Sequence, residues 1–250
     1  MKHAILKVAL VLAGLGALHS GATAQTSSAK VVIELFTSQG CSSCPSADAL
    51  LESYTKRDDV IALSVPVDYW DRLGWKDTFA SREHTNRQRD YAYARGDGQV
   101  YTPQVVVGGR LHVVGSSRSA IDGAIAATKT ALRESQVPLT VYFEDGALVV
   151  QVGGASAGTA IQNARLLLAV VQDAGKVAIR RGENADRTLS YYNIVRALKT
   201  IGTWAGTPST LRVARSEFSV AGTQSLVVML QNGAGGPIIN AAQIRIAGHS

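Results

Sequence analysis

Apolar runs alternate with amphipathic segments through the first half of the chain. Val31–Phe36 and Val60–Val67 are apolar enough to be buried strands. The segment between them places apolar side chains at helical spacing and is expected to be an amphipathic helix, with these residues on its buried side: Ala47, Leu50, Leu51 and Tyr54. Two buried strands separated by a helix predict a parallel pair joined by a crossover.

The pattern continues to about residue 132. Asp77–Ala94 is polar and predicts a helix with a solvated face, and Gln104–Val107 and Leu111–Val114 flank a Gly-Gly turn, as in a β-hairpin. Ser117–Leu132 has the period of a third helix. The predicted element order is therefore β-α-β-α-β-β-α.

After Pro138 the pattern changes to short β-rich runs. Turn signals such as Glu144-Asp145-Gly146 and Asp173-Ala174-Gly175 separate several of them. The runs are Leu139–Phe143, Ala147–Val152, Ala164–Val171, Val177–Arg180, Leu211–Phe218, Leu226–Gln231 and Ile238–Ile246. This half is predicted to be an all-β, antiparallel sandwich-like domain, with a boundary near Gln136.

Two cysteines, Cys41 and Cys44, are the only ones in the chain, and they lie between the first strand and the first helix. A thiolate at a helix N-terminus is stabilised by unpaired backbone N–H groups and by the helix dipole. We expect Cys41 to be the exposed nucleophile and Cys44, more buried, to resolve the mixed disulfide. A bridge across so short a loop adds little stability in the chain-entropy model, which favours a chemical role over a stapling one.

The first residues have the pattern of an export signal. Lys2 and Lys7 precede the apolar run Val8–Leu18, and Ala22-Thr23-Ala24 fits a cleavage site. The run is shorter than the roughly 20 residues that span a bilayer, so no stable membrane insertion is expected after cleavage. A periplasmic or secreted location follows. The formal charge of +6 is spread without basic blocks, which argues against a nucleic-acid partner.

Several motifs resemble those of an exported, thioredoxin-like bacterial family known as a domain of unknown function (DUF1223). They are Glu34 through Leu-Phe-Thr-Ser-Gln-Gly-Cys-Ser-Ser-Cys-Pro, Val67-Asp68-Tyr69-Trp70-Asp71, Gly74-Trp75-Lys76-Asp77, Tyr101-Thr102-Pro103-Gln104, Gly182-Glu183-Asn184 and Arg187-Thr188-Leu189. The resemblance implies a fold with a thioredoxin-like α/β domain followed by an all-β sandwich-like domain. The export pattern and the change of pattern after Pro138 divide the chain into a signal peptide at 1–24 and domains at 25–135 and 136–250.

The resemblance also implies roles for residues around the dithiol. Pro103 is expected to be a cis-proline that faces the dithiol, and Thr102 to offer its backbone to a bound substrate. Glu34 in the preceding strand can relay a proton to Cys44, or it can be salt-bridged instead. It lies one residue further from Cys41 than the buried acid of ordinary thioredoxins.

Two further groupings have alternative interpretations. Tyr69 and Trp70 follow the second strand, where they either receive a partner or simply pack a loop. Two thiolates and a histidine can bind copper or zinc, but His84, His112 and His249 lack the spacing of metal ligands.

The sequence therefore predicts an exported thiol–disulfide oxidoreductase that needs no cofactor and exchanges with protein or small-molecule thiols and disulfides. The alternative is a non-catalytic binding module or a copper-binding protein. The direction of electron flow is open.

Overall fold

The structure is a computed structural model that describes residues 25–26, 30–134, 137–155, 161 and 164–246. The strands are β1 (Gln25–Thr26), β2 (Val31–Thr37), β3 (Val60–Pro66), β4 (Gln104–Val107), β5 (Leu111–Val114), β6 (Leu139–Glu144), β7 (Ala147–Val152), β8 (Ala164–Ala178), β9 (Thr188–Trp204), β10 (Ser209–Val213), β11 (Ser225–Asn232) and β12 (Ile238–Arg245). The α-helices are α1 (Pro45–Thr55), α2 (Arg82–Arg95) and α3 (Arg118–Glu134), with short 3-10 turns η1 (Asp71–Leu73) and η2 (Arg215–Glu217). The predicted signal peptide, residues 1–24, and the predicted boundary at 135–136 lie outside the described residues.

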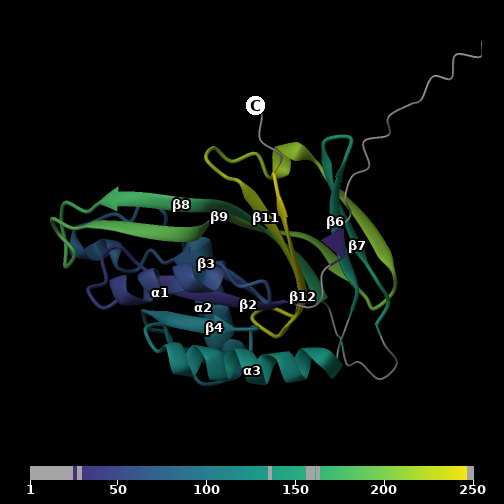
Figure 1. The fold of residues 1–250 in the computed structure, drawn as a ribbon, viewed down its shortest axis with the longest axis horizontal. Coiled ribbons are helices and arrows are strands. Elements are labelled where there is room, and N and C mark those ends of the chain that lie inside the picture. Colours follow the sequence, from purple (N-terminus) through teal and green to yellow (C-terminus); the bar gives the residue numbers. More distant parts are fainter. Residues whose placement is uncertain (1–24, 27–29, 135–136, 156–160, 162–163, 247–250) are drawn as a thin grey trace, which may run out of the picture.

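One mixed sheet of eight strands dominates the molecule, in the order β12-β11-β8-β9-β3-β2-β4-β5. β2 and β3 pair in parallel, as expected for two strands joined by a crossover helix, and β4 and β5 form the predicted hairpin. A smaller sheet, β1-β6-β7-β10, lies beside β12 in Figure 1. None of the helices in the described part of the chain is long and apolar enough to cross a membrane.

The predicted fold class, a thioredoxin-like α/β domain followed by an all-β sandwich-like domain, is wrong. Strands of both halves belong to the same eight-stranded sheet, and the described residues are mostly β with three α-helices. The two halves meet where β9 pairs in parallel with β3, through Ser64 and Ile194. They also share a hydrophobic core, in which Phe36 and Leu63 of the first half pack with Leu167 and Met229 of the second.

The long hairpin of β8 and β9 is the physical reason for this difference. Asp173-Ala174-Gly175 lies inside β8 and is not a turn. Gly175 is there for close packing, because a Cβ atom at this position would lie 2.7 Å from the Phe79 ring and 2.9 Å from Ile194. β9 has no counterpart among the predicted runs. Figure 1 shows the hairpin extending well beyond the other strands, over α1.

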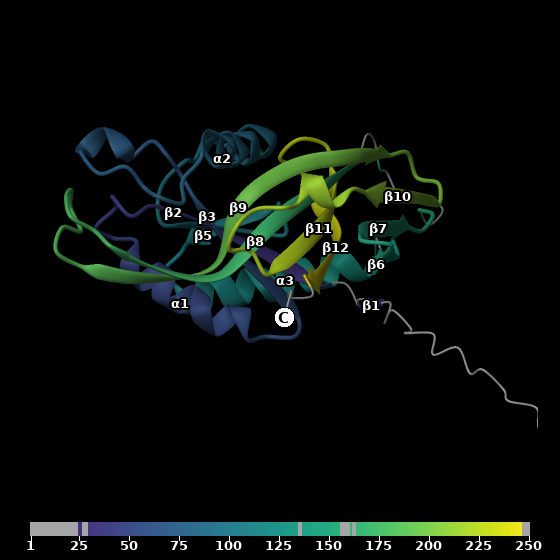
Figure 2. The ribbon, with the colours of Figure 1, turned by 90° about the horizontal axis from the view of Figure 1, so that it is seen from above.

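The helices cover the two faces of the sheet differently. α1 and α3 pack on one face, where Ile33 and Leu35 of β2 contact Leu51 and Ile125. α2 lies on the opposite face, as Figure 2 shows, and its Tyr91 joins the core around Phe36. Because side chains alternate along a strand, odd-numbered residues of β2 face α1 and even-numbered residues face α2.

Candidate functional site

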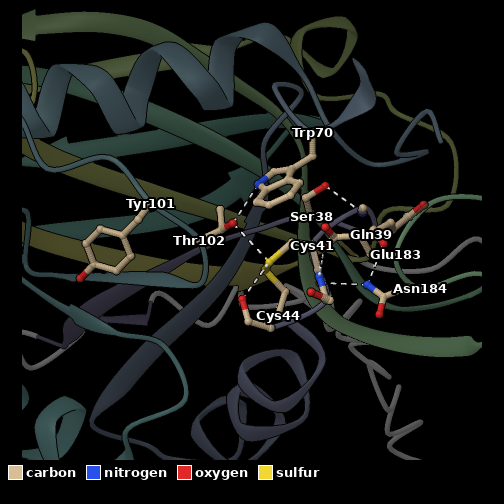
Figure 3. Close-up of a disulfide and its surroundings, with 12 residues drawn as sticks. Ser38, Gln39, Cys41, Cys44, Trp70, Tyr101, Thr102, Glu183 and Asn184 are labelled. Carbon is tan, nitrogen blue, oxygen red and sulfur yellow. Dashed lines mark hydrogen bonds between the residues drawn. A yellow bond between two sulfur atoms is a disulfide. The ribbon is translucent and has the colours of Figure 1, made fainter. Parts of the chain in front are cut away.

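The two cysteines form a disulfide in the turn between β2 and α1 (Figure 3). The S–S distance is 2.16 Å and the Cα atoms are 5.4 Å apart. Backbone bonds shape the turn: Cys41 N–H donates to the Ser38 carbonyl at 3.2 Å, and Cys44 N–H donates to the Cys41 carbonyl at 3.2 Å. Cys44 caps α1, and Pro45 follows at the first helical position, where a missing N–H is least costly. The predicted junction of strand, dithiol and helix is therefore present.

Both cysteines are 0% exposed, so the expectation of an exposed Cys41 is wrong. The Thr102 hydroxyl donates to Cys41 Sγ at 3.2 Å, and the Ser43 hydroxyl lies 3.4 Å from the same sulfur. The Trp70 indole N–H in turn donates to Thr102 Oγ1 at 2.9 Å, so the two side chains form a linked cover beside the disulfide (Figure 3). An incoming thiol can reach Cys41 only if part of this cover moves.

The structure brings three of the other predicted site residues to the disulfide. The Thr102–Pro103 peptide bond is cis and leads directly into β4, and Trp70 joins Thr102 as described. Tyr69 lies elsewhere: its hydroxyl donates to Gln88 of α2 at 3.2 Å. Tyr101 also points away in Figure 3, and its hydroxyl lies 2.9 Å from His112 Nδ1.

A second loop holds the turn before the cysteines. Gln39 N–H donates to Asp77 Oδ2 at 2.8 Å, and the Trp75 indole donates to Gln39 Oε1 at 2.8 Å. Asp77 also accepts the backbone N–H groups of Phe79 and Ala80. Burial raises the pKa of Asp77 to about 6, although these backbone bonds oppose the shift.

The tip of the β8–β9 hairpin closes the site from the second half of the chain. Asn184 is 0% exposed, and its amide donates to the carbonyls of Gln39 at 3.0 Å and Cys41 at 2.8 Å. Arg187 donates to Asn184 Oδ1 at 2.9 Å and fixes the amide in this orientation. Glu183 accepts the Ser42 N–H at 3.0 Å, and its hydrogen bonds from Ser42 lower its pKa. Sequence reasoning matched these residues as a motif but did not place them at the dithiol.

Glu34 lies in a buried ion pair on the other face of the sheet. Arg87 of α2 donates to its two oxygens at 2.5 and 3.0 Å, and the Tyr91 hydroxyl donates to Oε2. Arg87 also donates to Gln231 of β11 at 3.0 Å, so the network connects the two halves. Glu34 is an even-numbered residue of β2 and faces α2, whereas the helix that begins at the dithiol packs on the opposite face. Of the two interpretations of Glu34, this geometry favours the salt-bridged one.

A carboxyl group that sequence reasoning missed lies on α1. Asp48 is 3% exposed and belongs to the buried stripe of the helix, together with Ala47, Leu51 and Tyr54. Neither of its oxygens has a hydrogen-bond partner among the described residues. The signal in the sequence was an acidic residue inside an apolar helical stripe, one turn after Cys44.

The described residues contain no cluster of three or more His, Cys, Asp or Glu side chains that could hold a metal ion. His84 is buried against the Pro66 carbonyl, 2.9 Å from Nδ1, and burial lowers its pKa. His112 Nε2 lies 3.2 Å from Asp97. His249 lies outside the described residues.

Comparisons with known proteins give a matching family and two similar solved structures. A family model described as "Protein of unknown function (DUF1223)" matches residues 32–231. The chain is 34% identical to protein AGR_C_4864 from Agrobacterium tumefaciens, whose crystal structure gives a TM-score of 0.74 over 88% of this chain and 96% of that one. HBP35 of Porphyromonas gingivalis, 15% identical, shares the fold with a TM-score of 0.57 over 86% of this chain and 74% of that one. No curated protein matches the chain.

Proposed function

We propose that this chain, which belongs to the DUF1223 family of proteins of unknown function, is an exported protein that exchanges its Cys41–Cys44 disulfide with the thiols and disulfides of other molecules. In the oxidising direction, a substrate thiolate attacks Cys41 Sγ and releases Cys44, so that a mixed disulfide forms. A second substrate thiol then displaces Cys41, the substrate leaves as a disulfide, and both cysteines are reduced by two electrons in total. In the opposite direction the same steps run in reverse.

The observation that carries the proposal is a closed disulfide at the start of a helix, with hydroxyl groups directed at one sulfur. Thr102 donates to Cys41 Sγ, and the same hydrogen bond would stabilise a Cys41 thiolate. The start of α1 adds a favourable dipole. The cysteines are three positions apart, so in the chain-entropy model the bridge contributes little to folding stability. The dithiol is therefore better explained by chemistry than by stapling.

The side chains beside the disulfide support a role in admitting a partner. Trp70 and Thr102 cover Cys41, and Thr102 precedes a cis-proline at the start of β4. A partner that displaces the indole gains an aromatic contact and access to the sulfur in one movement. Pro103 and Thr102 then lie along the path of the bound thiol, with Tyr69 further away next to Trp70, 6.5 Å between ring centroids.

An exported location is part of the proposal. The apolar run at residues 8–18 follows a positive start, in the order of a secretory signal. Disulfides form and persist in the periplasm or outside the cell, whereas cytosolic thiols are kept reduced. A disulfide that exchanges with other proteins has its substrates in that compartment.

The experiment that tests the function is a measurement of the Cys41–Cys44 reduction potential together with two turnover assays. Insulin reduction tests the protein as a reductant, and refolding of a reduced, disulfide-containing protein tests it as an oxidant. The Cys41→Ser variant is the control and should be inactive in both. The Cys44→Ser variant should accumulate mixed disulfides with its substrates, because the resolving thiol is missing. Inactivity of the wild type in both assays would refute the proposal.

The burial of both sulfurs favours a second candidate, a non-catalytic module that binds a partner. In that case the disulfide only shapes the surface around Trp70 and Thr102. The two candidates differ in one measurement: a binding module keeps its partner affinity when both cysteines are replaced by serine, whereas an exchange protein loses all activity. Tight, stoichiometric copper uptake by the reduced protein would instead identify a copper-binding role.

A further inference from the structure

The helix that begins at the dithiol carries a buried carboxyl one turn from Cys44. Asp48 N–H donates to the Cys44 carbonyl at 3.0 Å, which makes residues 44 to 48 a regular α-helical turn. Side chains four positions apart on a helix are neighbours, with Cβ atoms about 5–6 Å apart. Both residues are buried, so they lie on the same face of α1, toward the sheet. This spacing makes the Asp48 carboxyl and the Cys44 sulfur neighbours, and a proton relay requires them within hydrogen-bond distance or joined by one water molecule.

This carboxyl is expensive to keep where it is. Neither Asp48 oxygen has a hydrogen-bond partner within the described structure, and the same is true of Thr37 Oγ1 and the Tyr191 hydroxyl. An unsatisfied buried polar group costs about 1–3 kcal/mol. An apolar residue at this position would continue the stripe of Ala47 and Leu51 at no such cost. A group that weakens the core in this way calls for an explanation in function.

The surroundings of Asp48 keep its carboxyl protonated near neutral pH. Burial is the main cause and raises the pKa of Asp48 to about 8. The nearby Thr37 hydroxyl lowers this pKa, although it makes no well-formed hydrogen bond to the carboxyl, and the Asp77 carboxyl raises it. Tyr191 of β9 interacts with both acids, which raise its pKa together with burial, while Arg187 lowers it. No Lys or Arg is paired with Asp48 in the part of the chain that the structure describes.

We propose that Asp48 delivers a proton to Cys44 when the disulfide opens and takes it back when the disulfide closes; this inference rests on the proposed thiol–disulfide exchange. On opening, a substrate thiolate bonds to Cys41 Sγ, the S–S bond breaks, and Cys44 Sγ leaves with the electron pair. The Asp48 carboxylic acid protonates that sulfur and becomes a carboxylate. On closing, the carboxylate removes the Cys44 proton, and the resulting thiolate attacks Cys41 Sγ and expels the substrate thiolate.

The sequence suggested this proton-relay role for Glu34, and the structure assigns it to Asp48 instead. Both acids are buried, but they lie on opposite faces of the large sheet. The alternation of side chains along β2 puts Glu34 on the α2 face and Thr37 on the α1 face, and Asp48 lies next to Thr37. Glu34 is held by Arg87 and has its charge balanced, whereas Asp48 has no cation paired with it among the described residues. An acid without a counter-ion changes protonation readily as its neighbour changes charge, which is what a relay requires.

The test is the pH dependence of disulfide opening in the full chain with Asp48→Asn. The probe is dithiothreitol, and the rate constant is expressed per dithiothreitol thiolate, with the loss of the disulfide followed by thiol alkylation and mass. In the wild type this rate constant should fall as the pH rises through about 8, where Asp48 loses its proton. In Asp48→Asn it should be independent of pH and lower at pH 7, on the order of 100-fold. Asp48→Glu should restore part of the pH dependence and part of the rate constant at pH 7.

The matched control is Glu34→Gln, which neutralises the other buried acid and should keep the wild-type pH profile. A wild-type profile in Asp48→Asn, or a lost profile in Glu34→Gln, would overturn the inference and leave the exchange function intact. A wild-type disulfide that dithiothreitol cannot open in the folded protein would overturn both. If Asp48→Asn does not fold, carbon-13 NMR titration of the Asp48 carboxyl in the wild type decides: its pKa must differ between the disulfide and dithiol forms, and equal values refute the relay.

Discussion

Replacing Asn184 by alanine should weaken the molecule at the point where its second half holds the turn that carries the disulfide. Asn184 is fully buried and donates to the carbonyls of Gln39 and Cys41. In Asn184→Ala the Gln39 carbonyl loses this donor in a buried site, which costs about 1–3 kcal/mol. The Cys41 carbonyl still accepts the Cys44 N–H, so its loss is closer to 1 kcal/mol. The free energy of unfolding should therefore fall by about 2–4 kcal/mol.

The same bonds should also control access to the sulfur. Cys41 is buried, and a thiol reaches it when the Trp70–Thr102 cover moves or when the turn itself opens; opening the turn breaks the hydrogen bonds from Asn184. If half of the loss in the free energy of unfolding applies to opening of the turn, the free energy of that opening falls by about 1–2 kcal/mol. Reduction of the disulfide by dithiothreitol then becomes about 10-fold faster. Urea unfolding measures the first effect and stopped-flow reduction the second, both on the oxidised protein.

Asn240→Ala is the matched control for this experiment. Asn240 is also buried and donates to one backbone carbonyl, that of Val137, at 2.7 Å. It lies on β12, the edge strand at the opposite end of the sheet order from β5, and its amide bonds to Val137 instead of the turn at the cysteines. The control should lower stability and leave the reduction rate unchanged. Equal reduction rates for the wild type, Asn184→Ala and Asn240→Ala would refute the claim that the hairpin governs access to the disulfide.

Three other variants test separate parts of the site. Glu183→Gln removes an exposed carboxylate that accepts the Ser42 N–H next to the cysteines. Loss of this negative charge should lower the pKa of the Cys41 thiol and so raise the reduction potential of the disulfide. Equilibration with glutathione measures this potential, and a lower value than in the wild type would contradict the reasoning. Arg87→Met leaves Glu34 buried without its cation and should cost about 3–5 kcal/mol in urea unfolding; a loss below 1 kcal/mol would mean that the ion pair is dispensable. For Asp48 the folded-state pKa is raised, so its own contribution to stability is greatest below about pH 4 and is lost as the pH rises to about 8, by up to about 1.4 kcal/mol per pH unit; in thermal unfolding the stability of Asp48→Asn relative to the wild type should therefore rise over this range.

The local elements of the first half could be predicted because each has a clear period. The predicted hairpin matches the structure residue by residue at Gln104–Val107 and Leu111–Val114, and the helix after Cys44 begins at Pro45. The CxxC spacing also located the disulfide, whereas the cis bond before Pro103 was implied by the family resemblance. The hairpin, the helix and the dithiol depend on neighbouring residues, which a linear reading captures.

The architecture could not be read in the same way because it depends on contacts between distant segments. β9 begins with alternation but then places Ile194 and Val195 in the buried set consecutively, where the register with β8 shifts. A bulge of this kind destroys the period of two that identifies a strand. Gly175 was mistaken for a turn residue, although its role is to let Phe79 approach the sheet. Only the folded structure shows that β9 runs on to pair with β3.

The extra length of β8 and β9 also explains how the site is assembled. If the hairpin had stopped at the pair Val171–Val195, its tip would not reach the turn at Cys41. The carbonyls of Gln39 and Cys41, which now accept from Asn184, would then need other donors. The dithiol segment is short and lacks a side-chain cap of its own, since Cys44 makes no capping hydrogen bond. Its conformation is therefore fixed from outside, by Asp77 on one side and Asn184 on the other. A turn held in this way links any opening of the Cys41–Cys44 disulfide to the stability of the hairpin that holds it.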